Sequence, residues 1–466
     1  MAKQDQVDLS PDAAVRVFVR WRPLTKVEIS QKNAEVSCEV KEEDETSYVL
    51  DVVGKVNNRL RKWSGSGFAG VLKDKDDNAS TFATTVEPIL LRVMEGGTGS
   101  CFCYGHTGSG KTHTVLGYGE EFGMYYRAAT KVAEMLKAIN DKEGTDLAIN
   151  VRFSELYNGK VYDLLKQRAE CHVRQDADGT VHIRSQTEKF ADGRVRVRPL
   201  HAVTCRDAEE VAKAVAMGTS LRTAGASTLH DQSSRSHAIL EMEIVTKELM
   251  EAREAVIQAE SELVPVGKRC TDIKIEEQSK MYVNVDGEWK FTGVQIDQAR
   301  IDAAEAELKV FEERVKAAEE RATSASRNGG HPCVGGTLVF VDLAGAEHGA
   351  DEGKMPGRSQ TAQERREGRQ INTELLALKE VIRARAQSQG NGAQGQRIPF
   401  RTCSLTMVLR RYLIANDCAC VMIANTSPSI EHTVKTINTL QYAALVTASS
   451  SGRAKKNIVT NLRVTR

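Results

Sequence analysis

Cys101–Thr114 reads CFCYGHTGSGKTHT and contains the spacing G-x-x-x-x-G-K-[ST] of a phosphate-binding loop. The glycines of such a loop let backbone N–H groups point at an anionic phosphate, Lys111 can reach the terminal phosphates, and the Thr112 hydroxyl can bind Mg²⁺. The apolar run Cys101–Tyr104 is typical of a buried strand, and a helix start can follow the loop. A glycine-rich turn that arose by chance is the alternative, but the strand context favours a nucleoside triphosphate site.

The composition is that of an ordinary globular chain: of 466 residues, 41% are hydrophobic and 27% are charged, and the net charge is +1. The length allows one large core or two ordinary ones. Because the overall field is close to neutral, a polyanionic partner must meet a local basic patch. The chain has no run of about 18 apolar residues to span a bilayer, and its start, MAKQDQVDLSPD, lacks the apolar centre of a signal peptide. We therefore expect a cytosolic protein.

The ten cysteines are scattered without paired C-x-x-C spacing. Cys418 and Cys420 lie in an apolar, strand-like run, where buried thiols are expected rather than metal ligands. The pattern predicts no disulfides and no structural zinc.

Two arginines stand near the first predicted strand. Residues 14–24 read AVRVFVRWRPL and alternate as a strand does, and Pro23 ends the alternation. Arg20 and Arg22 then lie on the same side. Such a pair is by default a solvated face, but it is also suited to line the base and ribose of a nucleotide.

Periodicity predicts most of the remaining elements. Strands are expected at 49–56 and 147–156, helices at 80–94, 127–140 and 208–217, and a basic turn at 55–62. Asp178-Gly179 and Asp192-Gly193 are typical of hairpins. The second arm of the latter hairpin, Arg194–Arg198, reads RVRVR. It is predicted either to form a solvated edge strand, whose charge blocks aggregation, or to bind an acidic partner.

A second apolar strand points to the same chemistry as the loop. Residues 336–347 read GTLVFVDLAGAE, a strand that ends at Asp342 and is followed by Gly345. P-loop nucleotidases use such an aspartate to hold Mg²⁺ through water, and a glycine N–H just beyond it can contact the terminal phosphate. Upstream, hydroxyl residues crowd around Arg235 in GASTLHDQSSRSH, a composition that usually forms a loop.

Seven motifs in order resemble those of the kinesin motor domain: VRWRPL, CYGHTGSGKT, SSRSH, DLAGAE, INTELLALKEVI, IPFRTCSLT and NTLQYA. The resemblance covers nearly all of the chain except 247–335. It implies an α/β P-loop NTPase fold whose central, mostly parallel mixed β-sheet is flanked by helices on both faces, with ATP and Mg²⁺ as cofactors. The implied domains are an N-terminal tail at 1–13, a motor domain at 14–446, and a C-terminal tail or neck remnant at 447–466.

Within this family the chain is most similar to kinesin-13, the group of internal motors that depolymerise microtubules. The similarity lies in YNGKVYDLL, in RTAGAS before SSRSH, and in Gly349-Ala350-Asp351. Two three-residue motifs of that group are matched at two of their three positions. Lys55-Val56-Asn57 stands in place of Lys-Val-Asp, and Lys379-Glu380-Val381 stands in place of Lys-Glu-Cys.

The resemblance also implies roles for individual residues. The implied metal ligands are Thr112, Ser234 and, through water, Asp342. The implied catalytic residues are Lys111, which holds the phosphates, Ser233, which positions the attacking water, Gly345, which senses the terminal phosphate, and Arg235 and Glu347, which form a closing salt bridge. The implied nucleotide-binding residues are Gly105, His106, Thr107, Gly108, Ser109, Gly110, Lys111 and Thr112, with Arg20, Arg22, Pro23 and His113 around the adenine.

Five residues depart from the family pattern: His106 replaces a glutamine, His230 an asparagine, His348 an arginine, Ser404 a lysine and Arg411 an aspartate. The first two stand where they can alter nucleotide affinity or water order. Ser404 removes one expected contact to tubulin. None of these changes removes a residue that the chemistry requires.

An insertion at 248–335 separates the last two motifs of the nucleotide site. Apolar residues at a 3-4 spacing in 249–263 and 301–318 predict coiled-coil helices, and KMYVNVDGEWKF between them predicts a hairpin around Asp286-Gly287. We expect an antiparallel helical hairpin with a β tip, or alternatively a single solvated helix for the second run. Strand directions place it at the end of the sheet far from ATP. Our hypothesis is an arm that binds a protein partner.

Tubulin is acidic, so the predicted microtubule contacts are basic: Lys55, Arg194, Arg196, Arg198, Lys379, Arg383, Arg397, Arg401 and Arg410, with Arg411 beside them. The main functional hypothesis is a cytoplasmic ATPase coupled to microtubules, acting as a motor or as a depolymerase. A microtubule-binding scaffold that does not hydrolyse ATP is the alternative, and a GTPase is disfavoured because Asn-Lys-x-Asp is absent. This segment is expected to be monomeric, with no nucleic acid or membrane partner.

Overall fold

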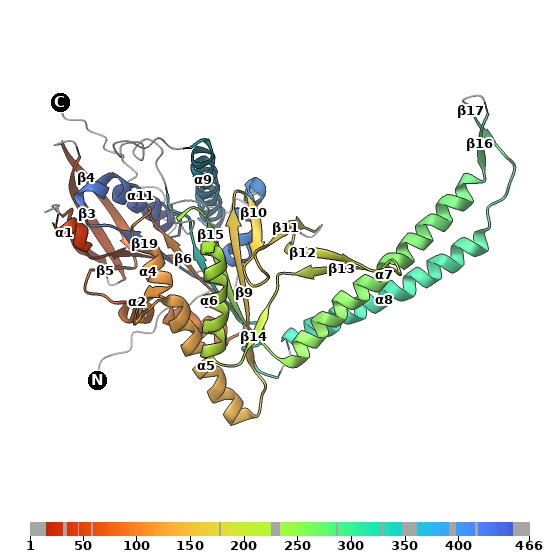
Figure 1. The fold of residues 1–466 in the computed structure, drawn as a ribbon, viewed down its shortest axis with the longest axis horizontal. Helices are drawn as coiled ribbons and strands as arrows, with labels where there is room; N and C mark the ends of the chain where they lie inside the picture. The colour runs from red at the N-terminus through yellow and green to blue at the C-terminus, as the bar shows by residue number, and fades with distance from the viewer. Residues whose placement is uncertain are drawn as a thin grey trace.

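The computed structural model describes residues 15–30, 35–44, 46–56, 59–176, 179–224, 234–285, 288–327, 330–346, 361–390, 398–414 and 418–450. A mixed central sheet organises them (Figure 1). The strand order is β13-β12-β11-β10-β9-β15-β18-β6-β19-β1-β5, and β14 pairs with β9. The strands are β1 (Arg16–Trp21), β5 (Gly70–Leu72), β6 (Thr98–Tyr104), β9 (Ala148–Tyr157), β10 (Lys160–Asp163), β11 (Ala169–Gln175), β12 (Val181–Lys189), β13 (Val195–Pro199), β14 (Val203–Cys205), β15 (His237–Val245), β18 (Thr337–Asp342) and β19 (Cys418–Thr426).

Parallel pairing is confined to one part of this sheet. Strands β18, β6, β19, β1 and β5 are parallel neighbours, whereas the pairs from β15 to β13 are antiparallel. The expectation of a mixed sheet is thus confirmed, but parallel pairs do not dominate it. The reason is local, because the predicted hairpins β11–β12 and β12–β13 extend the sheet by tight turns, which only antiparallel strands can use.

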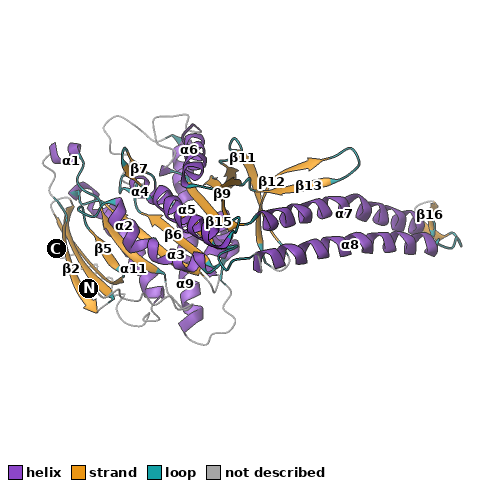
Figure 2. Cartoon of the chain, turned by 90° about the horizontal axis from the view of Figure 1, so that it is seen from below, coloured by secondary structure: helices purple, strands orange, loops and turns teal. Residues whose placement is uncertain are grey.

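Helices cover both faces of the sheet (Figure 2). One face packs against α2 (Asn78–Thr85), α3 (Glu87–Met94), α5 (Met124–Glu143) and α6 (Ala208–Ala224), and the other packs against α9 (Ala362–Gly390), α10 (Ser404–Ile414) and α11 (Thr433–Ser450). Two separate apolar cores result. Cys418 and Cys420 are buried, as predicted. No helix in the described part of the chain is both long and apolar enough to cross a membrane.

Smaller elements complete the body. A second, antiparallel sheet contains β2 (Ser37–Asp44), β3 (Ser47–Val56) and β4 (Arg59–Phe68), and short segments form α1 (Lys26–Ser30), α4 (Lys111–Val115), β7 (Gly117–Tyr118) and β8 (Glu121–Phe122). The predicted basic turn at 55–62 is wrong in part, because Arg59 already pairs with Val56 across a hairpin. The predicted helix at 80–94 is two helices, because Pro88 in the first turn of α3 lacks the N–H that would continue α2.

The insertion forms a projecting arm (Figure 1). It consists of α7 (Lys247–Ser279), β16 (Tyr282–Val285), β17 (Glu288–Phe291) and α8 (Gln298–Arg327), so the prediction of a helical hairpin with a β tip is confirmed and the single-helix alternative is wrong. At 1.5 Å per residue, the 33 residues of α7 span about 50 Å. The arm leaves from Val245, the end of β15 opposite to the Ala238–Asp342 pair, as expected from the strand directions.

Candidate functional site

Three segments meet at the carboxyl ends of β6 and β18. Asp342 lies beside Cys103 in the parallel register of these two strands, and Leu343 N donates to Cys103 O at 3.1 Å. Just beyond, Ala346 N donates to Gly105 O at 3.3 Å, and Gly345 N donates to Ser234 O at 2.8 Å. The glycine-rich loop, the Asp342 segment and the serine cluster are therefore joined by backbone hydrogen bonds.

The loop itself depends on its glycines. A Cβ at Gly105 would lie 2.3 Å from the Asn425 carbonyl oxygen, and Gly110 has φ +97° immediately before α4. Lys111 Nζ is buried and donates to the carbonyls of Gly105 at 2.9 Å and His106 at 3.1 Å. The buried hydroxyl of Ser109 has no hydrogen-bond partner in the described part of the chain. A compact loop that turns a lysine and a free hydroxyl inward fits a bound phosphate.

The Asp342 carboxylate has one satisfied oxygen and one free oxygen. Its side chain is buried, Oδ2 accepts from Arg222 Nη1 at 2.9 Å, and Oδ1 has no partner within the described segments. An unpaired carboxylate oxygen at this depth costs free energy unless an ion or water meets it. The side chains of Thr112 and Ser234 are half-buried on the neighbouring segments. Together these oxygen donors fit a Mg²⁺ ion that is held partly through water.

Arg222 is a residue of this site that sequence reasoning missed. It lies near the end of α6 and donates to Ser236 Oγ at 3.2 Å, to Ser236 O at 2.8 Å, and to Asp342. Burial lowers the pKa of its guanidinium, but Asp342 outweighs that effect and the net shift is upward. The helix predicted at 208–217 ended before this arginine, and only the RTAGAS motif contained it.

One ion pair and one hydrogen bond from a histidine ring connect this region to α9. Arg235 Nη1 lies 2.9 Å from Glu367 Oε2, and His237 Nε2 lies 3.2 Å from Glu374 Oε2. His237 Nδ1 accepts from Ala344 N at 3.0 Å, so this ring also contacts the segment that follows β18. Glu367 lies near the start of α9, and Glu374 lies further along the same helix. The predicted Arg235 pair with Glu347, like the role of Ser233, lies outside the described residues.

The arginines that were predicted to surround the base contact the loop and its neighbouring segments. Arg20 is buried and donates to Asn78 Oδ1 at 2.6 Å and Thr114 Oγ1 at 2.8 Å, so it is not a solvated residue. Arg22 forms a two-fold contact with Glu28 at 2.7 Å and donates to Gly108 O. The Arg22 hydrogen bonds lower the pKa of Glu28 to about 2. Arg20 thus contacts α4, which follows the loop, and Arg22 connects the loop to α1, whereas Pro23 is exposed.

His106 occupies the loop as a neutral ring. Its Nδ1 lies 2.8 Å from Thr107 O, its Nε2 has no partner among the described residues, and its ring centroid lies 5.0 Å from that of His432. Burial lowers the pKa of His106 well below its ordinary value, against the smaller effect of the Thr107 hydrogen bond. His230, the other histidine that departs from the family pattern in the nucleotide-site motifs, lies outside the described residues.

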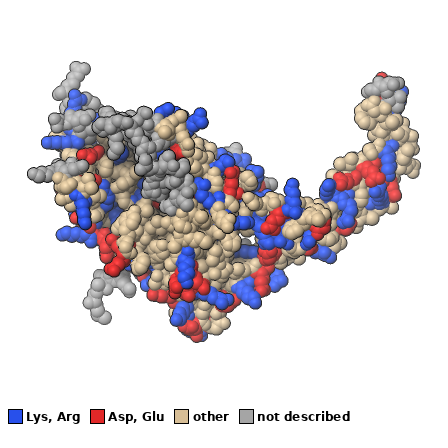
Figure 3. Space-filling model, viewed as in Figure 1, with Lys and Arg blue, Asp and Glu red and all other residues tan. Residues whose placement is uncertain are grey.

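The two arginines of β13, Arg196 and Arg198, form hydrogen bonds with the arm. Arg196 donates to Gln258 at 2.8 Å, and Arg198 contacts both oxygens of Glu254, at 2.8 and 2.6 Å. Both partners lie on α7, so the predicted edge strand is covered and its acidic contact belongs to the same chain. Arg194 instead pairs with Asp192 at 2.7 Å. Opposite charges also alternate along the arm (Figure 3).

The other predicted microtubule contacts lie elsewhere on the body. Lys55, Arg383 and Arg401 are exposed, and Lys379 is half-buried, which lowers its pKa together with the nearby charge of Arg383. Arg401 also donates to Gln175, and Arg410 donates to Gly179 O. Arg397 lies outside the described residues.

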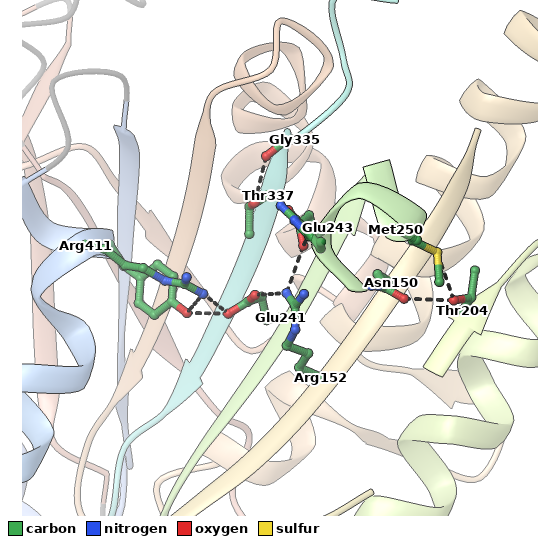
Figure 4. Close-up of polar contacts among 11 residues, drawn as sticks. Asn150, Arg152, Thr204, Glu241, Glu243, Met250, Gly335, Thr337 and Arg411 are labelled. Atoms are coloured by element: carbon green, nitrogen blue, oxygen red, sulfur yellow. Dashed lines mark hydrogen bonds and ion pairs between the residues drawn. The ribbon is translucent and has the colours of Figure 1, made fainter. Parts of the chain in front are cut away.

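A chain of ion pairs crosses the sheet to the arm (Figure 4). Arg411 and the hydroxyl of Tyr412 donate to Glu241, while Arg152 contacts Glu241 at 2.5 Å and Glu243 at 2.8 Å. Burial raises the pKa of Glu241, but Arg411 and Arg152 outweigh it and bring the value to about 2. On the arm, α7 contributes Arg253, which lies 2.6 Å from Glu243.

Comparison with known proteins identifies relatives of similar sequence. The family described as "Kinesin motor domain" matches residues 20–266 and 309–448. Kinesin-like protein KIF24 of Mus musculus is 28% identical over 439 residues, 94% of this chain and 24% of that protein. Kinesin-like protein KIN-13B of Arabidopsis thaliana is 28% identical over 453 residues, 96% of this chain and 49% of that protein. The chain thus spans at most about half the length of these relatives.

Solved structures show the same fold. The C-terminal motor and motor homology domain of Kar3Vik1, fused to a synthetic heterodimeric coiled coil, is similar with a TM-score of 0.58 at 22% identity, covering 93% of this chain and 84% of that chain. A KIF14 dimer in complex with a microtubule is similar with a TM-score of 0.57 at 22% identity, covering 93% of each chain.

Proposed function

The chain belongs to the kinesin motor domain family, and from this premise we propose that it is a microtubule-binding motor that hydrolyses ATP. The observation that carries the proposal is the hydrogen-bonded meeting of the phosphate-binding loop, Asp342 and the Ser234–Gly345 contact at one edge of the sheet. Each segment supplies a different group that phosphoryl transfer requires, and backbone hydrogen bonds join the segment after Asp342 both to the loop and to Ser234.

The proposed roles follow the chemistry of each group. ATP with Mg²⁺ supplies the terminal phosphate that is transferred to water. Lys111 and the loop N–H groups bind the phosphates, the hydroxyls of Thr112 and Ser234 bind the metal, and Asp342 holds its water shell. Gly345 senses the terminal phosphate, Ser233 orients the attacking water, and Arg235 closes the site with Glu347. Positioning and charge neutralisation, rather than covalent chemistry, then lower the barrier.

Coupling to the filament is proposed to run through α9. The ion pair Arg235–Glu367 and the hydrogen bond between His237 and Glu374 join this helix to the segments around the terminal phosphate. When that phosphate leaves, the segments relax and α9 shifts with them. Because Lys379 and Arg383 lie on α9, the basic surface offered to acidic tubulin changes with the nucleotide.

The proposed microtubule-binding surface retains the basic residues whose side chains have no hydrogen bond or ion pair to α7 among the described residues: Lys55, Arg194, Lys379, Arg383, Arg401 and Arg410. Arg397, which lies outside the described residues, stays a proposed contact. Arg196 and Arg198 are proposed to act indirectly, because they hold the arm against β13. Exposed charge contacts weaken beyond about 8 Å at physiological salt, so binding is expected to be salt-sensitive. The proposed location is cytoplasmic, on microtubules, with the arm as a possible site for a protein partner.

A second candidate is a microtubule-binding scaffold that hydrolyses ATP weakly or not at all. The observation that favours it is the buried, neutral His106 in the phosphate-binding loop, where the family usually has a glutamine. Translocation along the microtubule and depolymerisation of the microtubule are two further proposals. The similarity to KIN-13B supports a depolymerase, whereas Asn57 and Val381 depart from the motifs of that group.

Co-sedimentation with microtubules tests the proposed function. We expect the affinity to change at least fivefold between a non-hydrolysable ATP analogue and ADP, and expect Lys111→Ala to abolish the difference. Light scattering of stabilised microtubules in the same samples distinguishes a depolymerase, which lowers the signal, from a translocating motor. If the wild-type protein binds microtubules with the same affinity in the ATP analogue and in ADP, the result would support the scaffold instead.

A further inference from the structure

The hairpin β7–β8 follows the phosphate-binding loop directly, and no motif predicted it. Tyr118 pairs with Glu121 across it, and Gly117 has φ +82°. A Cβ at Gly117 would lie 1.9 Å from the Glu121 carbonyl oxygen, so only glycine allows this close approach. This close approach at Gly117 holds the hairpin together and thereby fixes the position of Glu121 beside α4.

Glu121 contacts two residues with its two carboxylate oxygens. Oε1 accepts from the Asn78 backbone N–H at 2.9 Å, and Oε2 lies 3.0 Å from His113 Nε2. The ring of Tyr118, on the same hairpin, has its centroid 5.6 Å from that of His113, at a tilt of 37°. The imidazole is therefore bounded on one side by a carboxylate and on another by an aromatic ring.

Asn78 joins this arrangement to the core. Its side chain is fully buried, Oδ1 accepts from Arg20 at 2.6 Å, and Nδ2 donates to the His113 carbonyl at 3.0 Å. His113 is consequently fixed twice, through its backbone by Asn78 and through its ring by Glu121. Arg20, which the resemblance also places near the base, therefore supports His113 through Asn78.

We propose that Glu121 is the positioning residue for the adenine base: it holds the His113 imidazole in the orientation that stacks on the base, and Tyr118 closes the outer edge. This inference rests on the proposed function, which assigns His113 to the base. Since a carboxylate only accepts, His113 Nε2 carries the hydrogen, and in the neutral ring Nδ1 remains an acceptor. A ring that is already oriented loses less rotational freedom when a base stacks on it.

Nucleotide binding of variants tests this role. We expect Glu121→Ala to weaken binding of a fluorescent ADP analogue about 3–10-fold, the value of one hydrogen bond, and to leave the affinity for inorganic tripolyphosphate unchanged. Glu120→Ala, in the exposed neighbour, is the matched control and should change neither. Glu121→Gln keeps one acceptor oxygen and should recover part of the ADP affinity, which also guards against a folding defect in the alanine variant.

The ring itself provides a readout that does not depend on nucleotide. In ¹⁵N-histidine spectra, with the signal assigned by His113→Gln, we expect an Nε2–H tautomer in the wild-type protein and a mixture in Glu121→Ala. Unchanged ADP affinity in Glu121→Ala, or equal losses for ADP and tripolyphosphate, would overturn the inference while leaving the proposed function intact. A wild-type protein that binds neither ligand would contradict the proposed function, and this inference with it.

Discussion

Arg222 and Asp342 form a deeply buried ion pair, and each depends on the other. The arginine has further hydrogen bonds to Ser236, whereas Asp342 keeps one oxygen free among the described residues. A buried pair of this kind contributes little net stability when intact, but removing one partner leaves an uncompensated charge. The arginine therefore holds one carboxylate oxygen of Asp342 in place and leaves the other without a protein partner among the described residues.

Substituting Arg222 by Met should lower the free energy of unfolding by about 3–5 kcal/mol, because Asp342 stays buried without its cation. Chemical denaturation measures the loss. The double variant Arg222→Met with Asp342→Asn removes both charges and should regain at least half of the stability without regaining ATP turnover. A double variant no more stable than the single one would refute the coupling.

Substituting Gly105 by Ala should weaken binding of ADP at least tenfold, because its Cβ would overlap the Asn425 carbonyl and push the loop aside. Fluorescence anisotropy with a labelled ADP checks this. Gly368→Ala in α9 is the control, since a Cβ there meets nothing within 4 Å. Equal affinity in the wild-type and Gly105→Ala proteins would show that the loop does not need this close approach.

At the scale of elements, the arm is anchored to the body by several ionic contacts on one side of α7. Glu254 and Gln258 hold β13, and Arg253 reaches Glu243 on β15. The first turn of α7 is fixed as well, because Thr246 caps it by accepting from Leu249 N. The arm is therefore expected to move with the sheet rather than hinge at its root.

The variant Arg198→Ser with Arg253→Ser should loosen this root. Small-angle scattering should then give a broader distribution of maximum dimensions than for the wild-type protein. Arg269→Ser is the control, because its partner Glu307 lies within the arm itself. If the double variant scatters like the wild-type protein, apolar packing alone sets the arm direction.

The sequence predicts some elements of the fold and of the site better than others. The strands, hairpins and helical arm follow from local periodicity and Asp-Gly turns, and the loop and Asp342 follow from motifs. The roles of Arg222 and Glu367 could not be predicted in this way, because their partners Asp342 and Arg235 are distant in sequence. Neither residue lies within a helix as we predicted it. The contact of Arg198 with Glu254 likewise joins residues 56 positions apart in the sequence. The RVRVR pattern at 194–198 therefore could not show whether the acidic contact of this strand is a partner protein or α7 of the same chain.

At the scale of the whole molecule, buried and half-buried carboxylates link stability to pH. The folded-state pKa values of Glu28 and Glu241 are lowered from 4.5 to about 2 by their arginine partners, although burial of Glu241 opposes the shift. A lowered folded-state pKa contributes stability that is complete above the unfolded value and is lost as the pH falls through the folded one. The stability that these two carboxylates contribute is therefore lost as the pH falls from 4.5 to about 2.

The melting temperature should therefore fall as the pH is lowered through this window, and Glu28→Gln should reduce the slope. Thermal unfolding followed by circular dichroism at several pH values measures it. Glu120→Gln, an exposed residue, is the control and should leave the slope unchanged. A melting temperature that stays constant from pH 4.5 to 2 would contradict the role assigned to these pairs.

The measurement that tests the central claim most directly is the rate of ATP hydrolysis by this chain alone and with microtubules, beside Lys111→Ala. We predict slow turnover alone, a rate at least tenfold higher with microtubules, and no turnover above background in the variant, because Lys111 is the buried cation of the loop. Wild-type protein that binds microtubules yet hydrolyses no ATP, with or without them, would contradict the account and leave the scaffold as the function of the chain.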